Sequence, residues 1–293
     1  MHVFVTGGSG FIGTHTIKEL IDHGHQVTAI ARSDASAKTL EELGAKVVRA
    51  TLEDTDVLFE HAKASDAVIH LAYIHDFADY SGRPARVDEN AVTTFGRALQ
   101  GTNKPLVTTT GVLTYTIDGD EDTAKTSGHR GRAEAIAFSF ADKGVRPISI
   151  RLGASVHGAG DHGFVPVLIQ KAKEAGYVGY PGDGSTRWPP IHVDDAATLY
   201  RLAIEKDIPG ATALHAIAEP AISQKALAEV IGKRLGLPLK SLNANETKAY
   251  YGWLEFFVTL DGELKSQKTR DITGWQPRGK TLLEDLESGT YFD

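Results

Sequence analysis

The chain has 293 residues, of which 41% are hydrophobic and 24% are charged, as in ordinary globular proteins. Its 31 Lys and Arg residues against 38 Asp and Glu residues leave a formal net charge of −7. This field repels polyanions, so we predict no nucleic-acid partner. The lack of cysteine excludes disulfides, zinc thiolates and a cysteine nucleophile. No apolar run approaches the roughly 18 uncharged residues of a membrane span, so we also predict no membrane partner.

The first half of the chain alternates short apolar strands with longer helical patterns. Strands are predicted over residues 3–7, 26–31, 45–50, 66–72, 105–110 and 147–153, and helices over residues 15–24, 38–44, 88–101 and 132–144. Near-continuous apolar strands are typical of a parallel sheet that helices cover on both faces. The prediction is therefore an α/β fold built on a doubly wound parallel sheet, with right-handed crossovers. The opening MHVFVTGG begins this pattern at once and lacks the features of a signal peptide, so we expect a cytoplasmic protein.

After residue 155 the pattern changes, because glycine and proline gather in HGAGDHGF and YPGDGSTRWPP. Further helices are predicted over residues 165–176, 193–207, 223–236 and 245–258. The length suits one sizeable domain with an appended lobe. We predict a main domain of residues 1–154 plus 187–218, and a smaller lobe of residues 155–186 plus 219–293 that caps the carboxyl ends of the strands.

A glycine-rich turn follows the first predicted strand. In TGGSGFIG, the residues Gly7, Gly10 and Gly13 have the spacing G-x-x-G-x-x-G and open a helix. Glycine permits the sharp turn and the close approach of backbone N–H groups to a pyrophosphate, and the helix N-terminus adds partial positive charge. We predict that this turn, with Phe11 and Ile12, binds a dinucleotide.

The end of the second strand distinguishes the two nicotinamide dinucleotides. An acidic residue there would accept a hydrogen bond from a free ribose 2′-OH, but this chain has Ala31, Arg32 and Ser33. Arg32 can bind a 2′-phosphate with its planar fork, while Ser33 adds a hydroxyl and Lys38 adds charge. We predict NADP(H) in preference to NAD(H). The alternative is a solvated Arg32, with Asp34 binding a ribose hydroxyl.

These segments resemble the extended short-chain dehydrogenase/reductase superfamily, which includes nucleotide-sugar epimerases and dehydratases. The shared motifs are TGGSGFIG, DAVIHLA, the strand end TTT, and IHVDDAA after a GDGSTR loop, and together they span most of the chain. The resemblance implies a Rossmann domain with a C-terminal substrate lobe, and it makes a homodimer plausible. It implies these cofactor contacts: Leu52, Glu53 and Asp54 near the adenine, Leu71 and Ala72 near the ribose, and Thr108 at the strand end TTT.

The same resemblance aligns Thr110 with the family's catalytic serine or threonine. Family members pair that hydroxyl with Tyr-x-x-x-Lys, and counting back from Glu134 puts Thr126 and Arg130 at those two positions. The tyrosine normally donates a proton as hydride arrives, assisted by the lysine. Threonine is too weak an acid for this, and Arg130 can bind ribose or stabilise an oxyanion but cannot shuttle protons. The chain therefore resembles an atypical branch of epimerase/dehydratase-like reductases, some of which reduce aldehydes.

Without the tyrosine, the proton must come from another group or from water. The candidates stand on segments expected at the carboxyl ends of the strands, and they are Tyr73, His75, Tyr115, His157 and His162. We favour His75, because it follows the fourth strand closely and an imidazole can supply a proton near neutrality. The alternative is that His75 is a hydrogen-bonded loop residue.

Four residues are predicted to line the substrate pocket, namely His157, His162, Arg187 and Trp188. The two histidines with Asp161 suggest a metal, but a glycine-rich loop is more typical of a cleft wall, and we predict no metal. Arg187 resembles the substrate-facing arginine of nucleotide-sugar enzymes. Trp188 either forms an apolar wall or packs in a core.

Three functions are compatible with these residues. The leading hypothesis is an NADPH-dependent reductase of a small carbonyl compound such as an aldehyde, a ketone or an activated enone. The second is a nucleotide-sugar epimerase or dehydratase, which the missing tyrosine and lysine disfavour. The third is a redox sensor that binds NADP(H) without catalysis.

Overall fold

The computed structural model describes residues 1–75, 79, 82–112, 118–122 and 128–292. Its centre is a seven-stranded parallel sheet with strand order β12-β7-β5-β4-β1-β2-β3. This order confirms the predicted doubly wound α/β fold of the Rossmann type. In that order the strands are β12 (Thr212–Ala216), β7 (Arg146–Leu152), β5 (Pro105–Gly111), β4 (Ala67–His70), β1 (His2–Thr6), β2 (Gln26–Ala31) and β3 (Lys46–Arg49).

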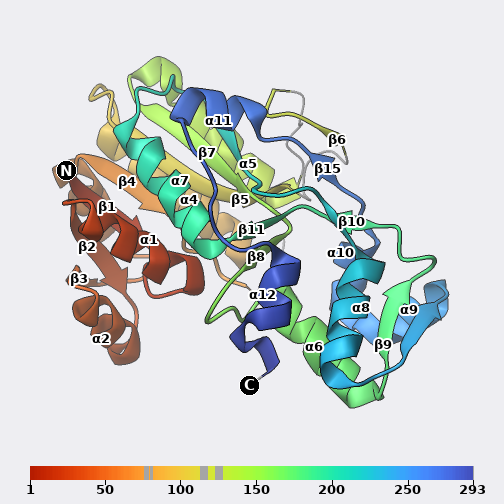
Figure 1. Cartoon of the computed structure of the whole chain (residues 1–293). Helices are drawn as coiled ribbons and strands as arrows, with labels where there is room; N and C mark the ends of the chain where they lie inside the picture. Colours follow the sequence, from red (N-terminus) through yellow and green to blue (C-terminus); the bar gives the residue numbers. More distant parts are fainter. Residues whose placement is uncertain (76–78, 80–81, 113–117, 123–127, 293) are drawn as a thin grey trace.

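Helices cover both faces of this sheet (Figure 1). The apolar residues of β1 show why: Val3 and Val5 belong to the core on one face and Phe4 to the core on the other, and all three are fully buried. Each such side chain contributes roughly 1.5–3 kcal/mol by leaving water. One face carries α1 (Phe11–Asp22), α2 (Asp34–Glu42) and α7 (Val193–Glu205), and the other carries α3 (Thr55–Ala64), α4 (Arg83–Leu99) and α5 (Gly128–Phe138).

The smaller lobe has its own hydrophobic core, which contains Trp188 and Tyr251. The predicted boundaries and the cores differ at two places, since Trp188 packs in the lobe, whereas Trp275 from the 219–293 segment packs in the core of the sheet. The lobe consists of α6 (Phe164–Ala175), β9 (Val178–Pro181), β10 (Arg187–Trp188), β13 (Ile222–Ser223), α8 (Gln224–Leu235), β14 (Leu239–Leu242), α9 (Ala244–Tyr251) and α10 (Glu255–Thr259).

The remaining elements join the two parts. Figure 1 shows α12 between the sheet and the lobe, close to the C-terminus of the chain. Two small parallel pairs lie beyond the carboxyl edge of the sheet, β8 with β11 and β6 with β15. The bounds of these elements are β6 (Asp118–Gly119), β8 (Ser155–His157), β11 (Pro190–His192), β15 (Glu263–Leu264), α11 (Gln267–Thr273) and α12 (Leu282–Ser288).

Candidate active site

The glycine turn between β1 and α1 has the geometry of a phosphate-binding loop. Gly7 has φ +73°, and a Cβ on it would lie 2.5 Å from the backbone nitrogen of Ala72. A Cβ on Gly13 would lie 2.1 Å from the carbonyl oxygen of Gly7. Gly10 is the N-cap of α1, with no side chain capping the helix and no acidic residue in its first turn. The first N–H groups of α1, which begins with Phe11, therefore remain available to an anion, and this turn fits a dinucleotide pyrophosphate.

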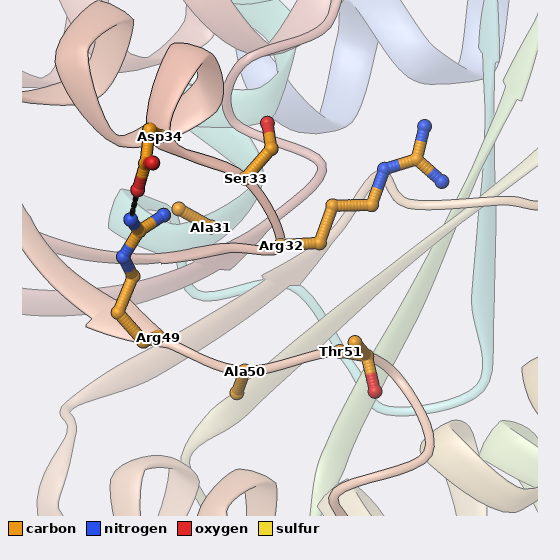
Figure 2. Close-up of a pocket in the computed structure, with 7 residues that line it drawn as sticks. All are labelled: Ala31, Arg32, Ser33, Asp34, Arg49, Ala50 and Thr51. Atoms are coloured by element: carbon orange, nitrogen blue, oxygen red, sulfur yellow. Dashed lines mark hydrogen bonds and ion pairs between the residues drawn. The ribbon is translucent and has the colours of Figure 1, made fainter.

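A cavity of about 400 Å³ lies beside the carboxyl ends of β2 and β3. Figure 2 shows the Arg32 side chain extending away from Asp34 and Arg49. The Ser33 hydroxyl caps α2 by accepting from the Ser36 amide at 3.2 Å. The lining residues are Ala31, Arg32, Ser33, Asp34, Arg49, Ala50 and Thr51.

Arg49, at the end of β3, is a second cation at this cavity that the sequence reasoning missed. Its guanidinium forms an ion pair with Asp34 (Figure 2). Among the described residues no hydrogen bond or ion pair engages the Arg32 guanidinium. Arg32 is therefore the cation at this cavity that stays available to a phosphate, while Asp34 is already committed to Arg49.

The other predicted cofactor residues lie along the same edge of the sheet. Leu52 is buried, whereas Glu53 is exposed and accepts from Arg83 at 2.5 and 3.2 Å. Leu71 and Ala72 are half-buried and adjoin the glycine turn, since the Leu71 amide donates to the Thr6 carbonyl at 3.1 Å. The turn, the cavity and these residues form one continuous strip along the carboxyl ends of β1, β2 and β4.

Arg130, on α5, has a fixed position at the end of β5. One nitrogen lies 3.3 Å from both carboxylate oxygens of Asp88, and another donates to the Thr109 carbonyl at 2.5 Å. Its guanidinium carbon lies 4.2 Å from the ring centre of Tyr73, as in a cation–π contact. These three partners fix the position of the guanidinium, which forms an ion pair with Asp88 and still acts as a positive charge on its neighbours.

Asp88 and His70 are members of this site that sequence reasoning missed. Both are buried, and the His70 Nε2 lies 3.0 Å from Asp88. Burial opposes ionisation of Asp88, but the Arg130 charge and the His70 hydrogen bond outweigh it, so its pKa lies below the ordinary value. Nε2–H of His70 therefore donates to Asp88, and Nδ1 accepts from the Thr6 hydroxyl at 2.6 Å. This chain of contacts links the glycine turn to Arg130.

Tyr73 and His75 follow β4 and lie beside Arg130. Their ring centres are 5.4 Å apart in an edge-to-face arrangement. Desolvation lowers the pKa of His75 below its usual value, and the positive charge of Arg130 and the nearby His162 lower it further. The His162 ring in turn lies 6.0 Å from the Phe11 ring. The structure thus brings Tyr73, His75, Arg130 and His162 together next to the glycine turn.

The hydroxyl residues of β5 are largely buried. Thr108 and Thr110 are 3% and 2% exposed. The hydroxyl of Thr109, between them, donates to the His70 carbonyl at 2.9 Å and accepts from the Tyr200 hydroxyl at 2.8 Å. Tyr115 and Thr126, which were singled out from the sequence, lie outside the described residues.

The remaining predicted substrate residues stand apart from this group. His157 is fully buried and donates to Asp285 at 3.0 Å. Trp188 is fully buried in the lobe, and its indole N–H donates to the Phe257 carbonyl at 2.9 Å. Both positions are those of packed interior residues.

Arg187 is held by two carboxylates. Its Nε and one terminal nitrogen donate to the two oxygens of Asp261 at 2.8 Å, and the other terminal nitrogen donates to Glu263 at 2.6 Å. These hydrogen bonds raise the pKa of Arg187. The cluster carries one positive and two negative charges, so it repels a diphosphate rather than binding one.

Two searches of the described residues complete the description of the site. No group of three or more His, Cys, Asp or Glu side chains among them could hold a metal ion. In the same part of the chain, no helix combines the length and the apolar character that a membrane crossing requires.

Comparison with known proteins agrees with this geometry. Residues 3–100 and 131–213 match the NAD dependent epimerase/dehydratase family. The chain belongs to this family. The matched segments contain the glycine turn and Asp88, whereas β5 and Arg130 lie in the unmatched gap of residues 101–130.

Individual relatives and a solved structure are similar to much or all of this chain. A protein of Schizosaccharomyces pombe described as uncharacterized is 38% identical over 297 residues, covering 100% of both chains. The 2-alkyl-3-oxoalkanoate reductase of Stenotrophomonas maltophilia is 27% identical over 226 residues, covering 72% of this chain and 67% of that protein. The structure of UDP-glucuronic acid 4-epimerase from Bacillus cereus in complex with NAD has a TM-score of 0.79 and 16% identity, covering 99% of this chain and 97% of that chain.

Proposed function

We propose that the protein is an NADPH-dependent reductase of a small carbonyl compound, such as an aldehyde, a ketone or an activated enone. One observation carries the proposal: Tyr73, His75 and Arg130 lie together beside the glycine turn, at the carboxyl ends of β4 and β5. Ligands of open parallel sheets bind at this edge. The similarity to a 2-alkyl-3-oxoalkanoate reductase, itself a carbonyl reductase by name, supports this choice of reaction.

In this proposal the bound dinucleotide supplies the hydride, and the protein supplies position, charge and a proton. Arg130 and the Thr110 hydroxyl stabilise negative charge on the carbonyl oxygen, as an oxyanion site does. His75 donates the proton to that oxygen. His162 lies next to Phe11.

The preference for NADP(H) rests on the cavity at the ends of β2 and β3. Arg32 would bind the 2′-phosphate, with Ser33 and Arg49 beside it. The similar B. cereus structure contains NAD, which supports a nicotinamide dinucleotide of either kind. Replacing Arg32 by Ala should raise the KM for NADPH about tenfold or more while leaving the KM for NADH unchanged, because a charged hydrogen-bonded pair is lost only with NADPH. Equal kcat/KM for the two cofactors in the unchanged protein would contradict the preference.

The first test follows NADPH absorbance with a panel of aldehydes, diketones and enones. Consumption of NADPH with one of these classes supports the reductase. Tight binding of NADPH without consumption across the panel would instead favour a redox sensor. A dinucleotide that copurifies and is never released would favour an epimerase, since that reaction regenerates its cofactor.

Thr110→Ala tests the oxyanion role directly. Loss of the hydroxyl should lower kcat by about tenfold or more, with little change in the KM for NADPH. Thr109→Val makes a matched control one residue away, because the Thr109 hydroxyl contacts His70 and Tyr200 rather than the cleft. Unchanged turnover in Thr110→Ala would remove the residue from this role.

A further inference from the structure

The loop of residues 158–163 crosses from the lobe to the glycine turn. A Cβ on Gly160 would lie 3.9 Å from the Phe11 ring, and the His162 ring packs edge-on against Phe11 at 6.0 Å. Phe11 is the first residue of α1, whose N–H groups face the proposed pyrophosphate site. The loop therefore lies against Phe11, at the N-terminal end of α1.

The chain itself holds this loop in place through a residue near its C-terminus. The Tyr291 hydroxyl donates to Asp161 at 2.8 Å and accepts from the Gly158 amide at 3.0 Å. Asp161 also accepts from the Gly163 amide at 2.6 Å, so both ends of the loop depend on this pair. The contact joins residues that are 130 positions apart in the sequence.

Tyr291 stands on a rigid support. It follows α12, which is anchored by the buried contact between Asp285 and His157. Its neighbour Phe292 lies 4.9 Å below the guanidinium of Arg234 on α8. A hydrogen bond from such a support restrains a loop more than one between two loops, because less conformational freedom remains to be lost.

We infer that Tyr291 is a positioning residue for the cofactor site, which it serves by tying the loop of residues 158–163 across Phe11 and so slowing the release of the dinucleotide. The inference rests on the proposed function in that it takes the glycine turn to bind NADPH. Tyr291 acts through Asp161 and the loop that carries His162. The pair is partly buried, and burial raises the pKa of Asp161 and of Tyr291, so solvent competes weakly for this hydrogen bond.

The test compares Tyr291→Phe with Tyr250→Phe. Tyr250 is a matched control in the same lobe, since its hydroxyl also accepts from a glycine amide, that of Gly179 at 3.3 Å, and donates to a second group, the Tyr177 carbonyl at 3.2 Å. The dissociation rate of NADPH is measured by fluorescence after displacement with excess NADP⁺. Tyr291→Phe should raise this rate by about fivefold or more, while Tyr250→Phe should leave it within about twofold of the unchanged protein. Equal rates in all three proteins, or equal acceleration in both variants, would overturn the inference.

Asp161→Ala supplies an independent check, because it removes the other half of the same contact. Its effect on the dissociation rate and that of Tyr291→Phe should not add in the double variant. Additive effects would mean that the two side chains act separately, against the inference.

A second readout separates this inference from the proposed function. Amide hydrogen exchange of the protein without ligand should speed up at residues 158–163 in Tyr291→Phe and not in Tyr250→Phe. Unchanged exchange at these residues would show that Tyr291 does not restrain the loop. If exchange at residues 158–163 speeds up in Tyr291→Phe but the unchanged protein binds no NADPH, Tyr291 does restrain the loop. In that case the proposed function and the role in cofactor release are both wrong.

Discussion

Asp88 and Glu89 are adjacent residues of α4, yet their ion pairs lie in different surroundings. Asp88 pairs with Arg130 in the interior, where their side chains are 5% and 12% exposed. Glu89 pairs with Arg132 at the surface, where the exposures are 24% and 54%. Both pairs join α4 to α5, and the positions differ in solvent exposure and in the additional hydrogen bond from His70 to Asp88.

Because removing one partner of a buried pair leaves an uncompensated charge, Asp88→Ala should lower the free energy of unfolding by about 3 kcal/mol. Glu89→Ala should change it by less than about 1 kcal/mol, as exposed pairs do. Urea denaturation measures both. Similar losses in the two variants would show that burial does not set the strength of the Asp88 contact.

His75 gives the proposed reaction a specific pH dependence. Its pKa is lowered by desolvation and by Arg130 and His162, so the ring is largely neutral at pH 7. A proton donor must be protonated, so kcat should rise as pH falls from 8 and level off only below the ordinary histidine pKa of about 6.5. In His75→Asn this rise should disappear, while the KM for NADPH stays similar. A persistent rise in the variant would assign the proton to another group.

At the level of elements, the turn between β1 and α1 contains two glycines, Gly13 and Gly10, that we expect to be required for different reasons. Gly13 is required by the protein itself, since a Cβ there would collide with the Gly7 carbonyl at 2.1 Å. At Gly10 the nearest such contact is 3.3 Å, and there we expect the constraint to come from the approach of the proposed phosphate. We expect Gly13→Ala to lower the melting temperature of the ligand-free protein. Gly10→Ala should nearly keep that temperature but bind NADPH at least about tenfold more weakly. Calorimetry on both variants, with and without NADPH, checks the separation.

The sequence predicted the sheet well and the helices less completely. The sheet strands are apolar and bounded by turns, so periodicity located each of them except β12. The helix α3 was missed because TDVLFEHAKA is short and only Leu58 and Ala62 are buried in it. The helix predicted over residues 245–258 is interrupted at Gly252, where φ is +60°. A single residue in a left-handed conformation ends a helix without changing its apolar pattern.

The sequence indicated which residue types belong to the site, but not how they pair. The glycine turn and Arg32 belong to local motifs, and so the pattern located them. Asp88 and Arg49 were missed because their roles arise from contacts with Arg130 and Asp34, which are 42 and 15 positions away. The pairing of Arg187 with Asp261, which is 74 positions later in the chain, could not be predicted from the sequence either. Side-chain pairing across elements leaves no periodic signal, so residue type alone could not show which arginines remain available.

For the molecule as a whole, the distribution of charge predicts which ligands it rejects. The net charge is −7, and the Arg187 cluster adds one more negative than positive group. UDP should therefore bind at this cluster with a dissociation constant no tighter than about 1 mM. NADPH should bind far more tightly, because its proposed site offers Arg32 and the N-terminus of α1. Isothermal calorimetry with each nucleotide provides the measurement.

The double variant Asp261→Asn with Glu263→Gln frees the Arg187 guanidinium from both of its carboxylates. It should bind UDP measurably better than the unchanged protein, with NADPH affinity retained. Micromolar binding of UDP to the unchanged protein would contradict this account and revive the nucleotide-sugar hypothesis.

The positions of the three tryptophans allow intrinsic fluorescence to report on one part of the molecule. Trp188 and Trp275 are 0% and 1% exposed, while Trp253 is 45% exposed and stands next to Phe164, two residues beyond His162. An aqueous quencher such as acrylamide will reach Trp253 first, and the other two indoles will give a steady, blue-shifted background. The unlabelled protein thus has a fluorescent probe, Trp253, next to the first residue of α6, where the loop of residues 158–163 ends.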